Sequence, residues 1–170
     1  MALSGVLLAM AASAELSGPA GLGTARVPAQ LNRRVSLANG TGAGRADRIY
    51  QARRTLAASA SEDLDLAGVL TDALGAGLTF VRVKGLFVAA SKGNTNNVVI
   101  GGAASNAWAT LLSATGTLTL RPGAMVGAMA GEADPTGYSV TASTGDILKV
   151  ANSGGGSAVT YDVLIVGASA

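Results

Sequence analysis

The sequence predicts an all-β protein, a jelly-roll-like β-sandwich of about eight or nine strands with an extended N-terminal arm. Three observations support this prediction. Short β-favouring segments recur at regular spacing after residue 46, with turn signals between them. No strong helical period separates those segments. Glycine and proline interrupt the preceding residues too often for them to form a core. We therefore expect an arm over residues 1–46 and a β-sandwich domain over residues 47–170.

Composition indicates that part of the surface is covered by partners. The chain has 170 residues, which suits one domain with an appendage. Only 13% of residues are charged, whereas 49% are hydrophobic and the mean hydropathy is +0.42. A monomer with so little surface charge is expected to be poorly soluble unless other subunits cover it. We take this as the first indication of assembly.

The chain has neither cysteine nor histidine, which excludes thiolate and imidazole chemistry and the usual zinc, copper and iron sites. Carboxylates remain, and the densest cluster is Glu62, Asp63 and Asp65. Alternation places Asp63 and Asp65 on the polar face of a strand, where solvent or an arginine is the ordinary partner. The pattern of a calcium-binding loop is absent. We expect no catalytic residues, no metal, no cofactor and no enzymatic activity.

The first 15 residues contain a short apolar run. No lysine or arginine precedes it, unlike an export signal, and it is shorter than the roughly 20 residues that span a membrane. Leu3, Leu7 and Met10 fall at helical spacing. We expect a small amphipathic helix, or an extended arm, that docks its apolar side on a neighbouring subunit. A membrane partner is not expected.

Residues 16–46 have the character of an arm. Single apolar residues are spaced along them like anchors for a neighbour's surface: Leu22, Val27, Leu31, Val35 and Leu37. Such a segment is expected to be disordered in isolation. The run Gly40–Gly44 lacks the lysine and hydroxyl residue of a phosphate-binding loop, so we interpret it as a hinge. Extended at ~3.3 Å per residue, the arm would reach beyond ~100 Å and bridge several subunits.

Charge is distributed unevenly along the chain. Before Leu56 there are seven arginines and two acidic residues, a net charge of +5, and the remainder carries −3. Arginine favours planar, multidentate contacts with carboxylates or phosphates. Aromatic residues for base stacking are missing here apart from Tyr50, so direct nucleic-acid binding is not expected. We expect the arginines to pair with an acidic protein surface: Arg26, Arg33, Arg34, Arg45, Arg48, Arg53 and Arg54.

The sandwich is expected around its longest β-favouring run, residues 78–90. Val81 and Val83 alternate with Phe80, Arg82 and Lys84, and after Gly85 the apolar residues change parity, which indicates a bulge. Only residues 69–74 and 103–112 could form a helical turn or two. The expected strands lie near 47–55, 62–67, 78–90, 97–101, 116–120, 124–130, 138–142, 146–152 and 158–167.

Two features could contact a ligand or partner. Trp108, the only tryptophan, could stack on a sugar, although a lone tryptophan is more often a core or interface plug. Asn94 and Asn97 lie in a polar loop that could meet a ligand, but asparagine-rich loops also simply form good turns.

Several segments together resemble small structural proteins from the virion gene clusters of tailed bacteriophages and prophages. They are NGTGAGRAD (39–47), RTLAASASEDLDLAG (54–68), NTNNVVIGGAASNAW (94–108), GTLTLRPGA (116–124) and TGDILKVANSGGGSAVTYDVLIVG (144–167). The resemblance implies a β-sandwich that assembles on virions. Members found on heads commonly form trimers that clamp neighbouring capsomers as decoration, cement or minor capsid proteins.

The resemblance does not decide between head and tail. The first expectation is a homotrimer on the capsid surface that binds the major capsid protein through the arm. The alternative is a tail or baseplate component with a receptor- or glycan-binding sandwich, which would use Trp108 and the Asn94–Asn97 loop.

Overall fold

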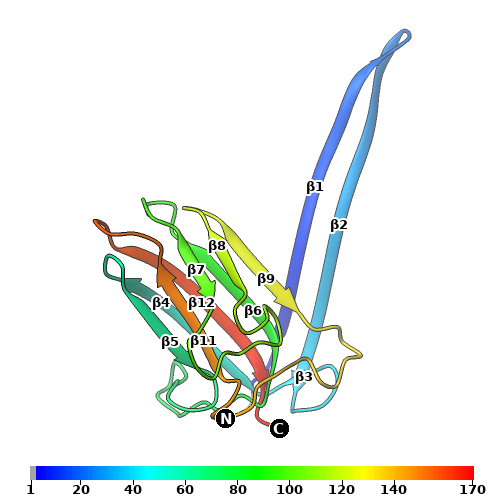
Figure 1. Cartoon of the computed structure of the whole chain (residues 1–170). Coiled ribbons are helices and arrows are strands. Elements are labelled where there is room, and N and C mark those ends of the chain that lie inside the picture. Colours follow the sequence, from blue (N-terminus) through cyan, green and yellow to red (C-terminus); the bar gives the residue numbers. More distant parts are fainter. Residues whose placement is uncertain (1–2) are drawn as a thin grey trace.

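The computed structural model describes residues 3–170, which form twelve strands and no helix. Among these residues, none lies in a helix long and apolar enough to cross a membrane. The structure has two parts, a two-layered β-sandwich and a long β-hairpin that projects beyond one end of it (Figure 1). The prediction of an all-β fold is confirmed.

The hairpin consists of β1 (Val6–Ala20) and β2 (Gly23–Asn39), which pair in antiparallel fashion over 15 consecutive residue pairs without a register shift. A two-residue turn, Gly21-Leu22, joins the strands. Gly21 has a φ of 56°, a conformation that suits the first central position of a tight hairpin turn. The hairpin extends about 50 Å, the length of 15 residues at ~3.3 Å each.

Of the two alternatives for the first residues of the arm, the extended one holds and the helix is wrong. The segment with helical spacing is a strand, because β2 supplies cross-strand partners that a helix of this length would not have. The arm is also not a single extended segment that reaches ~100 Å, since its two halves pair with each other and halve its span. The Gly40–Gly44 run forms a closed loop. Its ends are held by hydrogen bonds from Ala38 N to Gly44 O and from Gly40 N to Ala46 O.

The sandwich begins after β3 (Arg45–Ala46), which pairs with the end of β2. One sheet has the order β9-β6-β12-β4, with the short β10 also paired to β6. The other has the order β5-β11-β7-β8. The strand bounds are β4 (Arg48–Leu56), β5 (Ser61–Asp65), β6 (Arg82–Ala90), β7 (Val98–Gly101), β8 (Thr117–Leu120), β9 (Met125–Met129), β10 (Tyr138–Ser139), β11 (Ile147–Asn152) and β12 (Val159–Ala168).

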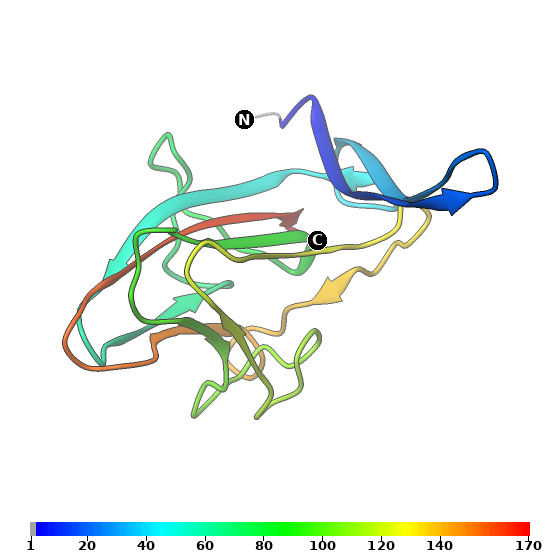
Figure 2. The same cartoon turned by 90° about the horizontal axis from the view of Figure 1, so that it is seen from above.

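The main core lies between the two sheets, which Figure 2 shows stacked on one another. Alternate residues of β12, such as Tyr161, Val163 and Ile165, face Leu148 and Val150 of the opposite sheet in one hydrophobic cluster. All nine predicted strand segments overlap an observed strand. The segment predicted from residue 78 becomes a strand only at Arg82. The two segments that could have been helical turns are loops.

The predicted bulge is confirmed in β6. Val166 pairs with Gly85 and Gly167 with Val83, so Lys84 has no opposite residue in β12. Lys84 is buried, and its ammonium donates a hydrogen bond to the carbonyl oxygen of Asp134 at 2.7 Å. The bulge thus accounts for the change of side-chain parity in this strand.

A second, smaller core fixes the base of the hairpin to the outer face of the β9-β6-β12-β4 sheet. It comprises Leu8, Val35 and Leu37 of the hairpin with Ala46 and Val166. Leu8 seats directly on Gly85, where an added methyl group would lie 2.7 Å from Leu8 Cδ1. The absence of a side chain at position 85 therefore makes room for the hairpin anchor.

Replacement of Leu8 by alanine should lower the free energy of unfolding by about 2–4 kcal/mol, because Leu8 is only 3% exposed. Leu7→Ala is the matched control, since Leu7 is 57% exposed on the other side of the same strand and should change stability by less than about 0.5 kcal/mol. Chemical denaturation of both variants measures the difference. Equal effects would contradict the anchoring role of Leu8.

Candidate interaction surface

The hairpin has two chemically different faces, because opposite residues of an antiparallel pair project to the same side. One face is formed by the even-numbered residues of β1 and their partners in β2: Val6, Leu8, Met10, Ala12, Ala14 and Leu16, opposite Leu37, Val35, Arg33, Leu31, Ala29 and Val27. Only Arg33 is charged on this side, which we call the apolar face. The other side, the polar face, presents Glu15, Arg26 and Arg34 with several hydroxyl and amide side chains, and between them lie Leu7, two alanines and two prolines.

The apolar face is covered only near the sandwich. Leu8, Val35 and Leu37 are buried at the base, whereas Leu16 is 74% exposed and Leu31 60% exposed farther out. Leu22 at the tip is fully exposed. The same chemical surface thus continues from a packed core into solvent. Two-stranded hairpins are marginally stable in water unless such a face is covered, so the distal apolar face is the strongest candidate for an interaction surface.

The predicted contacts of the N-terminal apolar residues differ among themselves. Leu3 packs partly against the small core at the hairpin base, and its amide donates to Asn39 Oδ1 at 3.1 Å. Leu7 projects from the polar face and is exposed. Met10 lies on the apolar face, at the point beyond which the sandwich no longer covers that face. Of the three, Met10 belongs to the candidate surface and Leu3 to the intramolecular contact.

Four of the seven arginines already have acidic partners within the chain. Arg26 pairs with Glu15 across the hairpin at 3.0 Å, and Arg48 pairs with Asp47 at 3.2 Å. Arg53 donates two hydrogen bonds to Asp162 and holds the pKa of that carboxyl below its usual value. Arg54 pairs with Glu62. Among the described residues, Arg33, Arg34 and Arg45 form no ion pair.

The expectation that the seven arginines pair with an acidic surface of another protein stays a prediction, but three of them lie outside the arm. Arg48, Arg53 and Arg54 lie in β4 of the sandwich. Their carboxylate partners are supplied by the same chain, so an external acidic surface is not needed to balance them. Of these seven arginines, the three without an acidic partner among the described residues lie on the hairpin and on β3.

The acidic cluster is divided among structural roles. Glu62 accepts a hydrogen bond from the Tyr161 hydroxyl at 2.7 Å and from Arg54 Nε at 2.9 Å, which links the two sheets at one end. Asp65 accepts from the amide of Ala67 and shapes the following loop. Within residues 3–170, no three acidic side chains gather as a metal site.

Burial, together with the hydrogen bond to Glu62, raises the pKa of Tyr161 above its ordinary value of 10.0. Up to about pH 10 the phenol is protonated in both states, and stability is unaffected. Above that pH the unfolded chain releases the proton while the folded chain retains it, so stability should fall as pH rises. Denaturation between pH 8 and 12 should show a smaller decline for Tyr161→Phe than for the natural protein; identical declines would contradict the assignment.

Trp108 is buried in the main core. It is 5% exposed, its indole N–H donates to the carbonyl oxygen of Ser139 at 2.8 Å, and its ring meets Tyr138 edge-on. No face of the indole is free to stack on a sugar in this arrangement. The expectation of a sugar platform at Trp108 is therefore not supported by its geometry.

The asparagine loop also has a structural task. The Asn94 side chain donates to Thr160 O at 2.9 Å and accepts from Thr160 N at 2.8 Å, as a paired strand residue would. The Asn97 backbone exchanges hydrogen bonds with Ser153. The Asn94 side chain thus ties the loop to β12, and the Asn97 backbone ties it to the segment after β11.

Because Trp108 is the only tryptophan, its fluorescence reports on the core directly. Its emission should be blue-shifted and should resist quenching by acrylamide until the protein unfolds. Mono- and oligosaccharides should leave the emission unchanged, since the indole is covered. Sugar-dependent quenching in the folded protein would restore the glycan-binding alternative.

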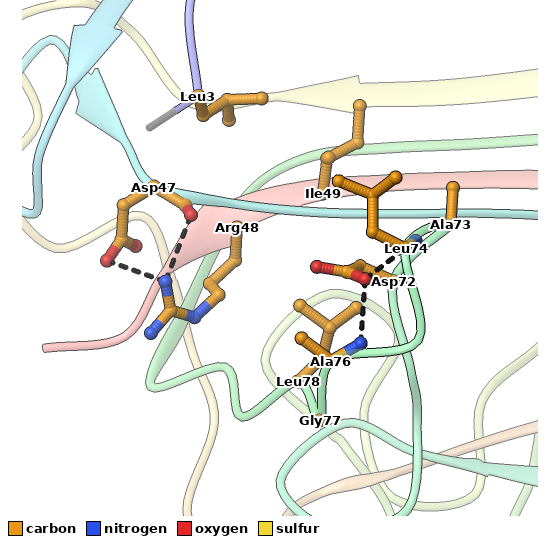
Figure 3. A pocket seen from close by; sticks show the side chains of 10 residues that line it. All are labelled: Leu3, Asp47, Arg48, Ile49, Asp72, Ala73, Leu74, Ala76, Gly77 and Leu78. Atoms are coloured by element: carbon orange, nitrogen blue, oxygen red, sulfur yellow. Dashed lines mark hydrogen bonds and ion pairs between the residues drawn. The ribbon is translucent and has the colours of Figure 1, made fainter. Parts of the chain in front are cut away.

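A hollow of about 360 Å³ lies at the base of the hairpin, between β4 and the loop that precedes β6 (Figure 3). Leu3, Ile49 and Leu78 give it an apolar lining. Its carboxylates are already engaged: Asp72 accepts the amides of Leu74 and Ala76 at 2.9 Å, and Asp47 pairs with Arg48. Its polar groups therefore serve the local fold.

Comparisons of the chain with protein-family models, curated proteins and solved structures find no match. The surfaces of the molecule therefore provide the evidence for its function. The most distinctive is the hairpin, and the sequence carries a partial signal for it: between Arg26 and Leu37 apolar residues alternate with polar ones, except at Pro28 and Arg33.

Proposed function

We propose that the protein is a non-enzymatic structural component of a tailed-phage virion, which binds the major capsid protein on the outer capsid surface and cements neighbouring capsomers as a homotrimer. The observation that carries this proposal is the hairpin, whose distal apolar face is exposed. An exposed apolar surface on a projecting hairpin is unusual for a monomeric enzyme or carrier. In a protein that assembles, the same surface contacts adjacent subunits.

The dimensions and charge of the hairpin support this role. A length of about 50 Å exceeds the ~30 Å diameter of a small protein domain, so the hairpin is long enough to extend from one subunit onto the next. Arg34 on the polar face and Arg45 at the base have no acidic partner among the described residues, and they are suited to pairing with carboxylates of the capsid. These contacts add to the apolar ones, and many weak contacts repeated over a shell give a large total effect.

We also interpret the sandwich as a jelly roll. In support, the chain passes repeatedly between the sheets, so that β4, β12, β6 and β9 form one layer and β5, β11, β7 and β8 form the other. The first and last strands of the sandwich lie side by side, and each sheet combines strands that are distant in sequence. This is the wiring expected of a rolled-up set of four antiparallel strand pairs.

A variant with a shortened hairpin tests the proposal. Replacing residues 13–30 by Asn-Gly retains the pairs from Val6–Leu37 to Ala12–Leu31, and therefore the buried base, with a turn suited to a hairpin. Occupancy on capsids built from the major capsid protein of the same phage should fall at least about tenfold. Trp108 emission checks that the sandwich remains folded.

Copy number per particle distinguishes head from tail. Hundreds of copies on purified particles, located over the capsid by labelling, agree with the proposal. A handful at the tail tip, or unchanged capsid occupancy of the shortened variant, would contradict it.

A further inference from the structure

The segment that joins β9 to β10, residues 130–137, passes beside the base of the hairpin. Its first residues line a groove together with Met10 and Val35 of the apolar face. Glu132 borders a second hollow together with Leu7, which belongs to the polar face. Figure 1 and Figure 2 show this β9–β10 segment running from the sandwich to the hairpin and back. It therefore lies next to both faces of the hairpin, whereas the sheet covers only one.

The β9–β10 segment lies tightly against the loop that follows β2. Gly44 in that loop has a φ of 61°, and a methyl group added there would approach the carbonyl oxygen of Glu132 to 3.3 Å. No side chain can therefore separate the segment from the loop that closes the hairpin base.

Two cationic side chains of β6 hold the β9–β10 segment on the sandwich. The Lys84 ammonium donates a hydrogen bond to the carbonyl oxygen of Asp134 at 2.7 Å. The Arg82 guanidinium donates to the carbonyl oxygen of Pro135, also at 2.7 Å. Both acceptors are backbone atoms, so these bonds fix the path of the chain itself.

The last residues of the segment pack directly on the Lys84 side chain. The Asp134 carboxylate accepts the amides of Thr136 and Gly137 at 2.8 and 3.0 Å, which folds the chain into a tight turn. A methyl group added at Gly137 would lie 2.6 Å from the carbonyl oxygen of Val83 and 3.1 Å from Lys84 Cδ. The turn thus has no room to shift on the bulged strand.

We infer that the β9–β10 segment is a strap that fixes the direction of the hairpin, and that the buried Lys84 ammonium holds this strap to the sandwich. This inference does not depend on a role in a virion, because it concerns the hairpin of the purified protein.

The length of the hairpin explains why its direction needs a second support. The small core holds the hairpin through one face and at one end only, by Leu8, Val35 and Leu37. Over a length of about 50 Å, a rotation of about 10° at the base moves the tip by about 9 Å. A contact beside the second face opposes that rotation at the point where it starts.

The energetics of Lys84 agree with a positioning role. The residue is 1% exposed, and burial of an ammonium that bonds to a neutral carbonyl costs free energy. Burial lowers the pKa of Lys84; the Asp134 carboxylate opposes this shift in part, and Arg82 adds to it. The charge therefore does not add to global stability, and its contribution is the fixed position of the segment.

Spin labels measure the direction of the hairpin, because the chain has no cysteine of its own. Leu22→Cys labels the exposed tip and Thr119→Cys an exposed position on β8. Pulsed dipolar spectroscopy of the full-length protein should give one narrow distance distribution. Lys84→Met keeps the aliphatic stem and removes the donor, so the distribution should broaden at least about twofold. The midpoint of chemical denaturation should stay the same or rise.

Lys149→Met is the matched control, since Lys149 lies in β11 of the other sheet, and it should leave the width unchanged. Gly137→Ala displaces the segment from β6 without changing the lysine or the hairpin, and it should broaden the distribution as Lys84→Met does. Gly155→Ala, in an exposed loop where a methyl group meets nothing closer than 3.5 Å, should not. Trp108 emission shows which variants are folded.

If Lys84→Met does not fold, Gly137→Ala decides by the same criterion. A broad distribution in the protein with the natural Lys84 and Gly137 would overturn the inference. Widths of the folded Lys84→Met and Gly137→Ala variants equal to those of their controls would also overturn it.

Discussion

The pairing of β1 with β2 is the constraint from which the other properties of the arm follow. Fifteen consecutive residue pairs hold the two halves of an otherwise irregular segment in one register. Because side chains alternate between the sides of a strand, this register also sorts most of the large apolar residues onto one face and most of the polar residues onto the other. A slip of a single residue would mix the two sets and remove both the anchor at the base and the surface beyond it.

The anchor shows how a sandwich can hold an element that mostly lies outside it. Gly85 and Gly127 leave two gaps on the outer face of a sheet, and Leu8 and the Phe87 ring occupy them. The bulge at Lys84 lies beside this contact, so the strand that receives the hairpin is also the one whose pairing is irregular. Arg53–Asp162 then joins neighbouring strands and Arg54–Glu62 joins the two sheets, without adding net charge to the surface.

Much of the sandwich could be predicted because a half-buried strand shows alternating apolar and polar residues in its sequence. In the last strand the apolar positions are Val159, Tyr161, Val163 and Ile165. The hairpin was harder to predict. Its prolines suggested breaks, but both strands of a two-stranded ribbon are edges, where Pro19 and Pro28 are tolerated. Ion pairs such as Arg53–Asp162 join residues 109 positions apart, and no local pattern shows such a pair. The burial of Trp108 likewise depends on Ser139 and Tyr138, which only the folded chain brings near it.

The two outer edges of the hairpin have a further consequence. Apart from the short β3, no strand in the described part of the chain bonds to the free edge of β2, and none bonds to that of β1. Exposed edges are templates on which strands of other molecules add, which is how fibrils grow. Pro19 and Pro28 each remove a backbone donor from these edges. The prolines thus oppose edge-to-edge pairing of hairpins from different molecules, although the hairpin is long.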